Sequence, residues 1–282
     1  MKKENKKMKQ NEFKSFLREE AEGFSGKSNN FVFSCDRNII TENDVVDSKG
    51  RNLKDCEKSK IHTSLLPQPL AGDLDNGKVF LCVLNPGFVN EDYFDESIVK
   101  HELMKQLKQE DPSMFWLKKE YENTGGGKYW RKKFDQQNKN FSLVESILKE
   151  YRKNKIMVHG VDITKEDVFM MLSKIVVDLE LIPYHSEKGP KFQYKLDSAK
   201  KMMDYVHKEL IPEGRNDRII CFLRSIKEWG VTEEEKRMDN VFCNEKKNSR
   251  VRNFTFNVEL PLGKFIFNHL REITDDFTIY LG

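Results

Sequence analysis

The feature that most constrains this chain is an apolar run that stops at an Asn-Pro-Gly turn. Six of the seven residues from Val79 to Asn85 are apolar, and polar residues do not alternate with them. This pattern is typical of a central parallel strand that is covered on both faces. Pro86 lacks a backbone donor and Gly87 permits backbone conformations closed to other residues, so the strand is predicted to end there. Ligands of open α/β sheets bind outside the carboxyl ends of strands, which makes this turn the first candidate site.

Further apolar runs of strand length alternate with segments of helical periodicity. Strand-like runs lie at residues 175–182, 219–223 and 241–243, and helical spacing occurs at residues 12–22, 96–109, 141–153, 165–174, 197–210 and 263–273. This alternation predicts an α/β fold around a mainly parallel sheet. Residues 1–64 are predicted to form an N-terminal tail, a short helix and an irregular lead-in. The α/β domain is predicted to occupy residues 65–282.

Charge and hydropathy limit the partners that fit the chain. The 49 basic and 46 acidic residues leave a net charge of only +3, so any DNA affinity has to come from local clusters of cations. No apolar run approaches the roughly 18 residues of a membrane span, and the Lys-rich start lacks the apolar core of a secretory signal. A cytoplasmic protein with no membrane partner is therefore predicted.

The cysteines are scattered through the chain and include no Cys-x-x-Cys pair. They are Cys35, Cys56, Cys82, Cys221 and Cys243. Three of them lie inside strand-like runs, which favours buried reduced thiols over ligands of zinc or an iron–sulfur cluster. No metal site is predicted.

The turn also carries a resemblance to a known family. Leu84-Asn85-Pro86-Gly87 resembles the first active-site motif of the uracil-DNA glycosylase superfamily, in the form used by its mismatch-specific and single-strand-selective branches. The order and spacing of the runs at 175–186, 219–225 and 241–244 fit that family over residues 65–270. The resemblance implies a three-layer α/β/α sandwich with a central, mainly parallel four-stranded sheet. It also implies a DNA glycosylase that needs no cofactor.

Two residues at the predicted strand ends receive catalytic roles from the resemblance. Asn85 matches the position that orients the attacking water; because asparagine is a poor general base, it would position the water rather than deprotonate it. The alternative is that Asn85 only caps its own turn, as Asn before Pro commonly does. His185 follows the second strand and would stabilise negative charge on the departing base. The alternative for His185 is an ordinary hydrogen-bonded surface residue.

The turn and the segment after it are predicted to form the walls of the pocket. Pro86 and Gly87 would let the backbone approach the sugar or phosphate, and Phe88, Tyr93 or Phe94 would stack on the flipped base. For any one of these aromatic residues, packing in the core is the alternative.

The second strand departs from the family at the base-reading position. Glu180 stands where the single-strand-selective branch uses an asparagine to read uracil. An ionised carboxylate only accepts hydrogen bonds, whereas an amide also donates, so glutamate suits a base with an amino group, such as cytosine or a modified cytosine. The alternative is that Glu180 pairs with Arg224 at the end of the neighbouring strand. Such a pair would itself line the site.

Two basic segments are candidates for contacts with nucleic acid. Residues 123–134 combine three glycines with basic and aromatic residues, which predicts a mobile DNA-contacting loop, the start of an amphipathic helix with Trp130 and Phe134 in the core, or both together. Residues 244–253 replace the family's second motif and alternate Asn and Ser with four cations. The predicted contacts to the lesion are Asn244 and Asn248, and those to the DNA backbone are Lys128, Trp130, Arg131, Ser186, Lys246, Lys247, Arg250 and Arg252.

Three functions fit this sequence. The first is a DNA glycosylase-like enzyme that removes uracil or a modified cytosine, in DNA repair or in defence against phages with modified DNA. The second is a catalytically inactive nucleic-acid-binding module on the same fold, which the altered second motif favours. The third is an unrelated α/β hydrolase or nucleotide-binding enzyme, but the chain has no Gly-x-Ser-x-Gly elbow, phosphate-binding Gly-Lys loop or dinucleotide fingerprint.

Overall fold

A sheet of five strands lies at the centre of the protein. The computed structural model describes residues 4–26, 30–46, 57–135, 142–154, 157–158, 161–190, 196–212, 217–223, 225–243 and 263–270. The strand order is β1 (Leu70–Ala71), β5 (Val176–Glu180), β2 (Val79–Val83), β6 (Ile219–Phe222) and β7 (Val241–Cys243). Strands β5, β2, β6 and β7 are parallel, and β1 is antiparallel to β5. The mixed α/β class predicted from the apolar pattern is confirmed.

The sheet has one strand more than the four that the resemblance implies. The additional strand, β1, is only two residues long and pairs Leu70 with Leu179 at one edge of the sheet. Two residues carry no periodicity, so the sequence pattern cannot reveal such a strand. A separate two-stranded sheet joins β3 (Met157–Val158) to β4 (Val161–Asp162).

Helices precede and connect the strands in the order that the sequence predicts. They are α1 (Glu4–Phe24), α2 (Asp92–Lys108), α3 (Gly125–Asp135), α4 (Leu143–Lys153), α5 (Lys165–Ile175) and α6 (Asp197–Tyr205), which continues as a π-helical turn, Val206–Leu210. Residues 263–270 are also helical. Short 3₁₀ turns lie at Ser34–Asp36, Glu42–Asp44, Phe115–Leu117, Lys119–Tyr121 and Glu235–Arg237. Residues 1–10 are expected from the sequence to form the tail, but helix α1 begins at Glu4, so residues 4–10 are helical.

Local capping explains where two of these helices begin. The hydroxyl of Ser142 accepts a hydrogen bond from the backbone N–H of Glu145 at the start of α4. At the start of α5, Thr164 accepts from the N–H of Asp167, whose carboxylate in turn accepts from the Thr164 N–H. Both arrangements satisfy backbone donors that a first helical turn leaves unpaired.

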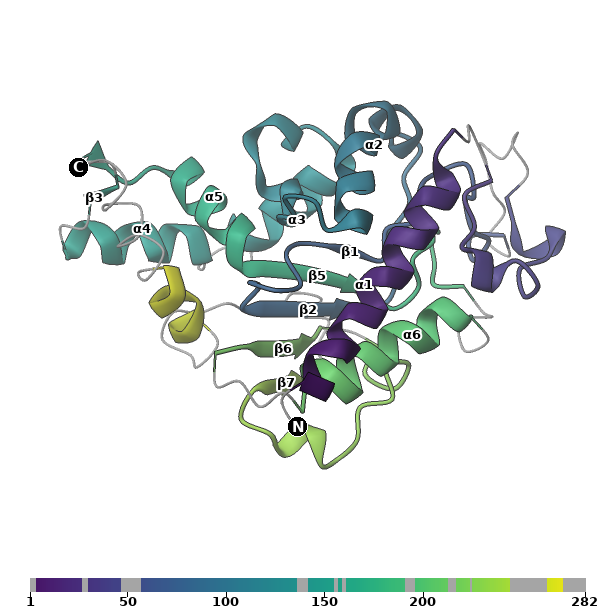
Figure 1. The fold of residues 1–282 in the computed structure, drawn as a ribbon. Coiled ribbons are helices and arrows are strands. Elements are labelled where there is room, and N and C mark those ends of the chain that lie inside the picture. The colour runs from purple at the N-terminus through teal and green to yellow at the C-terminus, as the bar shows by residue number, and fades with distance from the viewer. Residues whose placement is uncertain are drawn as a thin grey trace.

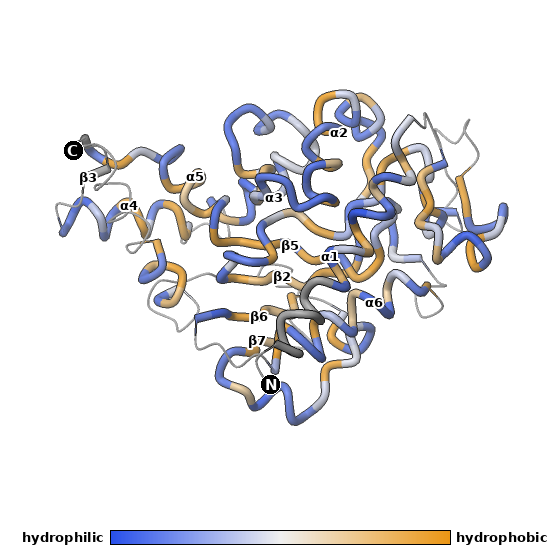
Figure 2. The backbone as a smooth tube through the Cα atoms, in the orientation of Figure 1, coloured by the Kyte–Doolittle hydropathy of each residue, from blue (hydrophilic) through white to orange (hydrophobic). Residues whose placement is uncertain are grey.

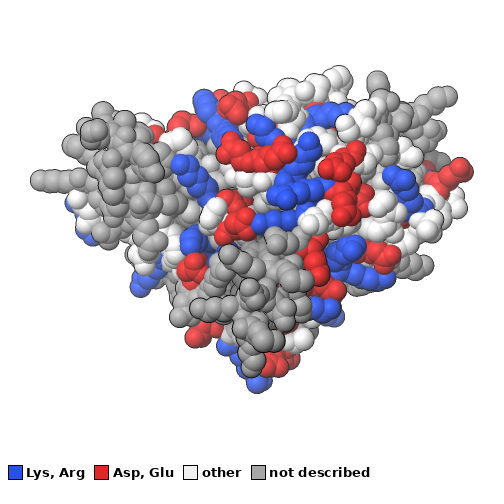
Figure 3. Space-filling model, in the orientation of Figure 1, with Lys and Arg blue, Asp and Glu red and all other residues white. Residues whose placement is uncertain are grey.

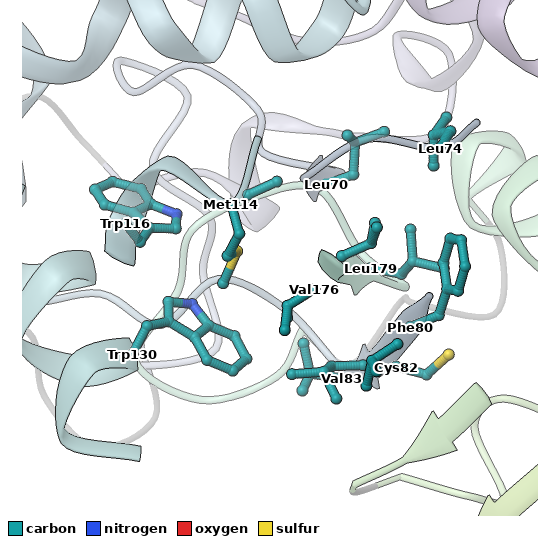
Figure 4. Packing of buried hydrophobic residues seen from close by; sticks show 14 of the residues in the cluster. Leu70, Leu74, Phe80, Cys82, Val83, Met114, Trp116, Trp130, Val176 and Leu179 are labelled. Atoms are coloured by element: carbon teal, nitrogen blue, oxygen red, sulfur yellow. The ribbon is translucent and has the colours of Figure 1, made fainter. Parts of the chain in front are cut away.

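The central strands are buried along their whole length, including the two acidic residues of β5. Every residue of β2, β5 and β6 is buried, and these strands stand out as apolar in Figure 2. In the close view of Figure 4, Val83 and Val176 point toward Trp116 and Trp130, whereas Phe80 points to the opposite side of the strands. Both faces of the sheet are therefore covered, which leaves the strand ends as the candidate site.

The glycine run before Lys128 starts helix α3, so the helical alternative holds and the mobile loop does not. Each glycine lies where a side chain would collide with a neighbour. An added Cβ at Gly126 would lie 2.6 Å from the ring of Trp116, and one at Gly127 would lie 1.9 Å from the carbonyl oxygen of Tyr121. The run is therefore a signal of close packing between α3 and the preceding 3₁₀ turns.

Gly127→Ala is expected to destabilise the protein by about 3 kcal/mol, because the contact is with backbone that cannot rotate away. Gly23→Ala in α1 is the matched control, since an added Cβ there meets nothing within 4 Å. Alanine is the better helix former, so this control should be slightly more stable than the wild type. Urea unfolding measures both changes, and equal stability of Gly127→Ala and the wild type would contradict the packing.

The lead-in before residue 65 belongs to the same hydrophobic core as the sheet. Phe31, Phe33 and Ile61 are almost fully buried and lie in one cluster with β2 and β5. In Figure 1 this segment lies near the edge toward which the arrows of β2 and β5 point. Within the described ranges, no helix combines the length and apolarity that a bilayer crossing requires.

Two of the three strand cysteines, Cys82 and Cys221, are buried as predicted. Cys82 on β2 and Cys221 on β6 are fully enclosed, and this burial raises the pKa of both thiols well above the usual value. Cys243 lies on β7 and is partly buried. Cys56 lies outside the described residues. The raised pKa values keep the two buried thiols protonated and chemically inert.

Candidate functional site

The segments that follow β2 and β5 lie side by side at the carboxyl ends of the strands. The arrows of β2, β5 and β6 point to the same edge in Figure 1. Beyond the strands, Ile182 N donates to Leu84 O at 2.9 Å. Farther along, Ser186 N donates to Pro86 O at 3.3 Å. The Asn-Pro-Gly turn and residues 182–186 therefore meet, as the two parallel strand ends predict.

The Asn85 side chain is held by acceptors on both segments. Its Nδ2 lies 2.8 Å from Pro86 O, 2.9 Å from Ser186 Oγ and 3.3 Å from Ser186 O. Because carbonyl oxygens only accept, these contacts identify the amide nitrogen and turn Oδ1 away from them. Oδ1 accepts no hydrogen bond from the part of the chain that the structure describes. Asn85 thus caps its own turn and also presents a fixed acceptor.

Ser186 is buried and holds Asn85. Only 1% of Ser186 is exposed, and its hydroxyl donates to Lys188 O at 2.6 Å while it accepts from Asn85. Gly189, three residues farther along the same segment, packs closely against the residue before Asn85. An added Cβ at Gly189 would lie 2.4 Å from Leu84 Cδ2. The structure therefore places Ser186 as a support of Asn85, with both of its hydroxyl bonds inside the protein.

His185 lies against the turn with one ring nitrogen bonded. Its Nδ1 is 3.0 Å from Gly87 O, and because a carbonyl only accepts, Nδ1 carries the proton. Burial lowers the pKa of His185 to about 4, although the carbonyls of Gly87 and Leu66 favour the charged ring. His185 is therefore a neutral imidazole at pH 7, next to the residue predicted to bind water.

A second histidine joins the site from the lead-in. His62 is buried, its backbone N donates to His185 O at 3.0 Å, and its ring stacks on Phe88 with a centroid separation of 3.5 Å. Its Nδ1 lies 2.6 Å from the hydroxyl of Tyr93. Burial, followed by the neighbouring His185, lowers the pKa of His62 to about 4. Phe88 and Tyr93, which follow the turn in the chain, therefore both contact His62.

Tyr93 and Phe94 differ sharply in how much of each ring is exposed. Phe94 is 76% exposed on the outer face of α2, whereas Tyr93 is 37% exposed and is tied to His62. Phe88 is buried under His62. Of the three predicted stacking residues, Phe94 alone is largely exposed.

Carboxylates surround the loop that joins the turn to α2. Asp92 accepts a hydrogen bond from Val89 N, and Asp95 accepts from Gly125 N at the start of α3. Burial raises the pKa of Asp92 to about 6, with a smaller increase from the neighbouring carboxylates. These bonds join the turn, α2 and α3 into one rim beside Asn85.

Glu180 is the last residue of β5 and has a buried carboxyl neighbour. Asp178 lies two residues earlier and on the same face of the strand, and the two side chains are 5% and 0% exposed. Burial raises the pKa of Asp178 well above its usual value, and neither of its carboxylate oxygens has a hydrogen-bond partner among the described residues. A carboxyl pair that retains a proton can both donate and accept. The pair therefore differs from the lone ionised carboxylate that the sequence suggests.

The predicted DNA contacts on α3 divide between surface and interior. Lys128 is exposed, whereas Trp130 is 5% exposed and lies in the core. Arg131 donates to Leu117 O at 2.7 Å and to the carboxylate of Glu166 at 2.5 Å. Trp130 and Arg131 thus stabilise the fold, and Lys128 remains at the surface.

Several predicted site residues lie outside the described residues. They are Arg224, Asn244, Asn248, Lys246, Lys247, Arg250 and Arg252. Their predicted contacts with the base and the DNA backbone stay predictions. On the face shown in Figure 3, basic and acidic side chains alternate, in keeping with the small net charge.

A buried polar contact orients the segment that carries His185 and Ser186. The hydroxyl of Tyr184 donates to Asp36 at 2.8 Å and accepts from Phe33 N at 3.1 Å. The second carboxylate oxygen of Asp36 accepts from Ser198 N at the start of α6. This fully buried carboxylate therefore ties the lead-in and α6 to the residue that precedes His185.

No family model, curated protein or solved structure matches this chain, so the site itself carries the argument about function.

Proposed function

We propose that the protein is a DNA glycosylase-like enzyme that hydrolyses the N-glycosidic bond of a flipped damaged or modified base. The observation that supports this most is the fixed amide of Asn85 at the carboxyl end of a central parallel strand. Its Nδ2 is held by Pro86 and Ser186, which leaves Oδ1 as an acceptor for a water molecule. Positioning of water at a strand end is what this hydrolysis requires of the protein.

The chemistry of the site suits a reaction in which the bond to the base breaks ahead of water attack. An amide accepts a proton poorly, so Asn85 orients the water and does not activate it strongly. The bonding electron pair leaves with the base, and the water adds to the cation-like sugar carbon. Because His185 Nδ1 donates to Gly87 O, the neutral ring offers only Nε2 as an acceptor, so His185 can accept a hydrogen bond from the attacking water and does not donate to the departing base. Turnover is expected to be slow.

The carboxyl pair on β5 supports a pyrimidine substrate. Glu180 pairs with Val83 across β2 and β5, one position before the turn begins. As an acceptor it suits the amino group of cytosine or a modified cytosine. A proton retained with Asp178 adds a donor, which a carbonyl-bearing base such as uracil requires. Uracil and modified cytosines are therefore the two substrate classes to compare.

The test incubates the protein with single- and double-stranded oligonucleotides that contain uracil, hydroxymethylcytosine or glucosylated hydroxymethylcytosine, and then cleaves abasic sites with alkali. Breaks at the modified position alone are the expected result. Breaks only at modified cytosine would show that Glu180 acts mainly as an acceptor, and breaks at uracil would show that the carboxyl pair also donates. Salt-dependent DNA binding without breaks at any base would show that the protein is a nucleic-acid-binding module and not a glycosylase.

A further inference from the structure

The largest fully buried side chain among the described residues reaches the strand end that precedes the Asn-Pro-Gly turn. Trp229 is 0% exposed, and its indole Nε1–H donates to the carbonyl oxygen of Val83 at 3.0 Å. Val83 is the last residue of β2 and stands two residues before Asn85. The same oxygen accepts a hydrogen bond from Leu181 N, just after β5, at 3.2 Å. One carbonyl therefore joins Trp229, the end of β2 and the segment that follows β5.

A histidine holds the backbone of Trp229. His207, on the π-helical turn after α6, has Nε2 at 2.6 Å from Trp229 O and Nδ1 at 2.6 Å from Glu235 Oε1. Because a carbonyl oxygen only accepts, Nε2 carries a proton, and a second proton lies between Nδ1 and the carboxyl group. Thr232 donates from its N–H and its hydroxyl to the other carboxyl oxygen of Glu235. The backbone of Trp229 is therefore fixed by a histidine whose two ring nitrogens are both bonded.

Aromatic packing restricts the indole further. The ring of Phe222, the last residue of β6, meets Trp229 edge to face with a centroid separation of 5.7 Å and stacks on His207. A side chain that served the core only by its apolar area would need no donor aimed at a strand-end carbonyl. Buried polar networks whose members are all bonded make a structure rigid and specify one arrangement. The network through Trp229 therefore specifies where β2 ends.

We propose that Trp229 is a positioning residue that holds the Asn-Pro-Gly turn in the place that base release requires. This inference rests on the proposed function. The Val83 carbonyl belongs to the peptide that leads into Leu84, so its direction sets the path of the chain to Asn85. Trp229 and Leu181 bind this oxygen from two segments, so movement of the strand end would break at least one of these bonds. A displacement of about 1 Å at a reacting group can lower a rate about 100-fold, which makes a rigid strand end important for the rate.

Trp229→Phe removes the indole donor and keeps an aromatic ring in the core. At saturating protein, single-turnover base release is expected to fall about tenfold, because Leu181 N still binds the Val83 carbonyl. The protein concentration that gives half of this rate should not change, since Trp229 is fully buried.

The matched control is Trp116→Phe. It removes a buried indole whose Nε1 makes no hydrogen bond with the described part of the chain, so base should be released at the wild-type rate. Urea unfolding gives the folded fraction of each variant, and the rates are compared per folded molecule.

Amide hydrogen exchange observes the strand end without any DNA. Leu181 N–H bonds to Val83 O, and Ile182 N–H bonds to Leu84 O. Both amides are expected to exchange about fivefold faster in Trp229→Phe, the effect of one lost hydrogen bond on a local opening equilibrium. Ile219 N–H bonds to Lys78 O at the opposite end of the sheet and is the internal reference. A merely structural role would raise the exchange of all three amides by the same factor.

The outcomes separate this inference from the proposed function. Faster exchange at the strand end of Trp229→Phe, in a protein that releases no base from any DNA, would support the hold of Trp229 on the turn and overturn the glycosylase. Base release by Trp229→Phe at the wild-type rate would overturn the inference and leave the glycosylase intact. An equal rise in exchange at all three amides, or an equal loss of base release in Trp116→Phe, would show that Trp229 only packs the core and would also overturn the inference.

Discussion

Asn85→Ala is expected to reduce base release at least about 100-fold and to leave the fold intact. In the proposed reaction the amide accepts a hydrogen bond from the water through Oδ1, and the direction of Oδ1 is fixed by the bonds from Nδ2 to Pro86 and Ser186. Removal of the amide leaves the water unplaced, and a misplaced reactant typically lowers a rate by about this factor. Single-turnover release from the preferred oligonucleotide measures the effect.

Two further variants test whether orientation of the amide is what matters. Ser186→Ala removes one acceptor but keeps the Ser186 carbonyl, so a smaller loss of about tenfold is expected. Asn154→Ala changes an exposed asparagine at the end of α4 and serves as the control with unchanged activity. Wild-type rates in Asn85→Ala, with release still confined to the modified base, would show that another residue places the water.

Acidification from pH 7 to pH 5 is expected to lower the free energy of unfolding through His62 and His185. Burial lowers the pKa of both from 6.5 to about 4. Between these values the unfolded chain binds protons that the native protein does not. Stability is therefore complete above pH 6.5 and falls as the pH drops toward 4. At pH 5 each histidine lowers stability by about 2 kcal/mol, since one pKa unit corresponds to about 1.4 kcal/mol.

The comparison of wild type, His62→Gln and His101→Gln isolates this effect. The raised pKa of Asp92, about 6, has the opposite effect, because the native protein binds this proton more readily than the unfolded chain does. Asp92 is present in all three proteins, so its contribution cancels in the comparison. Urea unfolding at both pH values should show that His62→Gln loses about 2 kcal/mol less than the wild type on acidification. The exposed-histidine variant should lose as much as the wild type. Equal losses in all three proteins would contradict a buried neutral His62.

The sequence is informative about the fold wherever burial produces a pattern. Strands β2, β5 and β6 are buried on both faces, and the unbroken apolar runs of β2 and β6 identify those two directly, whereas Asp178 and Glu180 interrupt the run of β5. The two-residue β1 has no such pattern, and it forms because the Pro-rich approach brings Leu70 beside Leu179. The glycines of α3 suggest flexibility, but they are required by contacts with Trp116 and Tyr121. Long-range packing of this kind is not visible in local sequence.

In the candidate site, too, some residues could be predicted from the sequence and others could not. Asn85 and His185 follow predicted strands, so topology brings them together as expected. His62 comes from a polar, irregular segment and carries no periodic signal, and only its stacking on Phe88 reveals it. Asp178 has a signal that could have been read, because an acid two residues before Glu180 in an apolar strand predicts a buried carboxyl pair.

The central claim is that the edge around Asn85 releases a base from DNA, and mass spectrometry of the released small molecules tests it most directly. The protein is incubated with uracil-containing DNA and with DNA containing modified cytosines, and the low-molecular-weight fraction is analysed. One free base, equal in amount to the abasic sites formed and missing with Asn85→Ala, is the predicted result. The absence of any free base from every DNA, with wild-type protein that unfolds cooperatively, would contradict the claim.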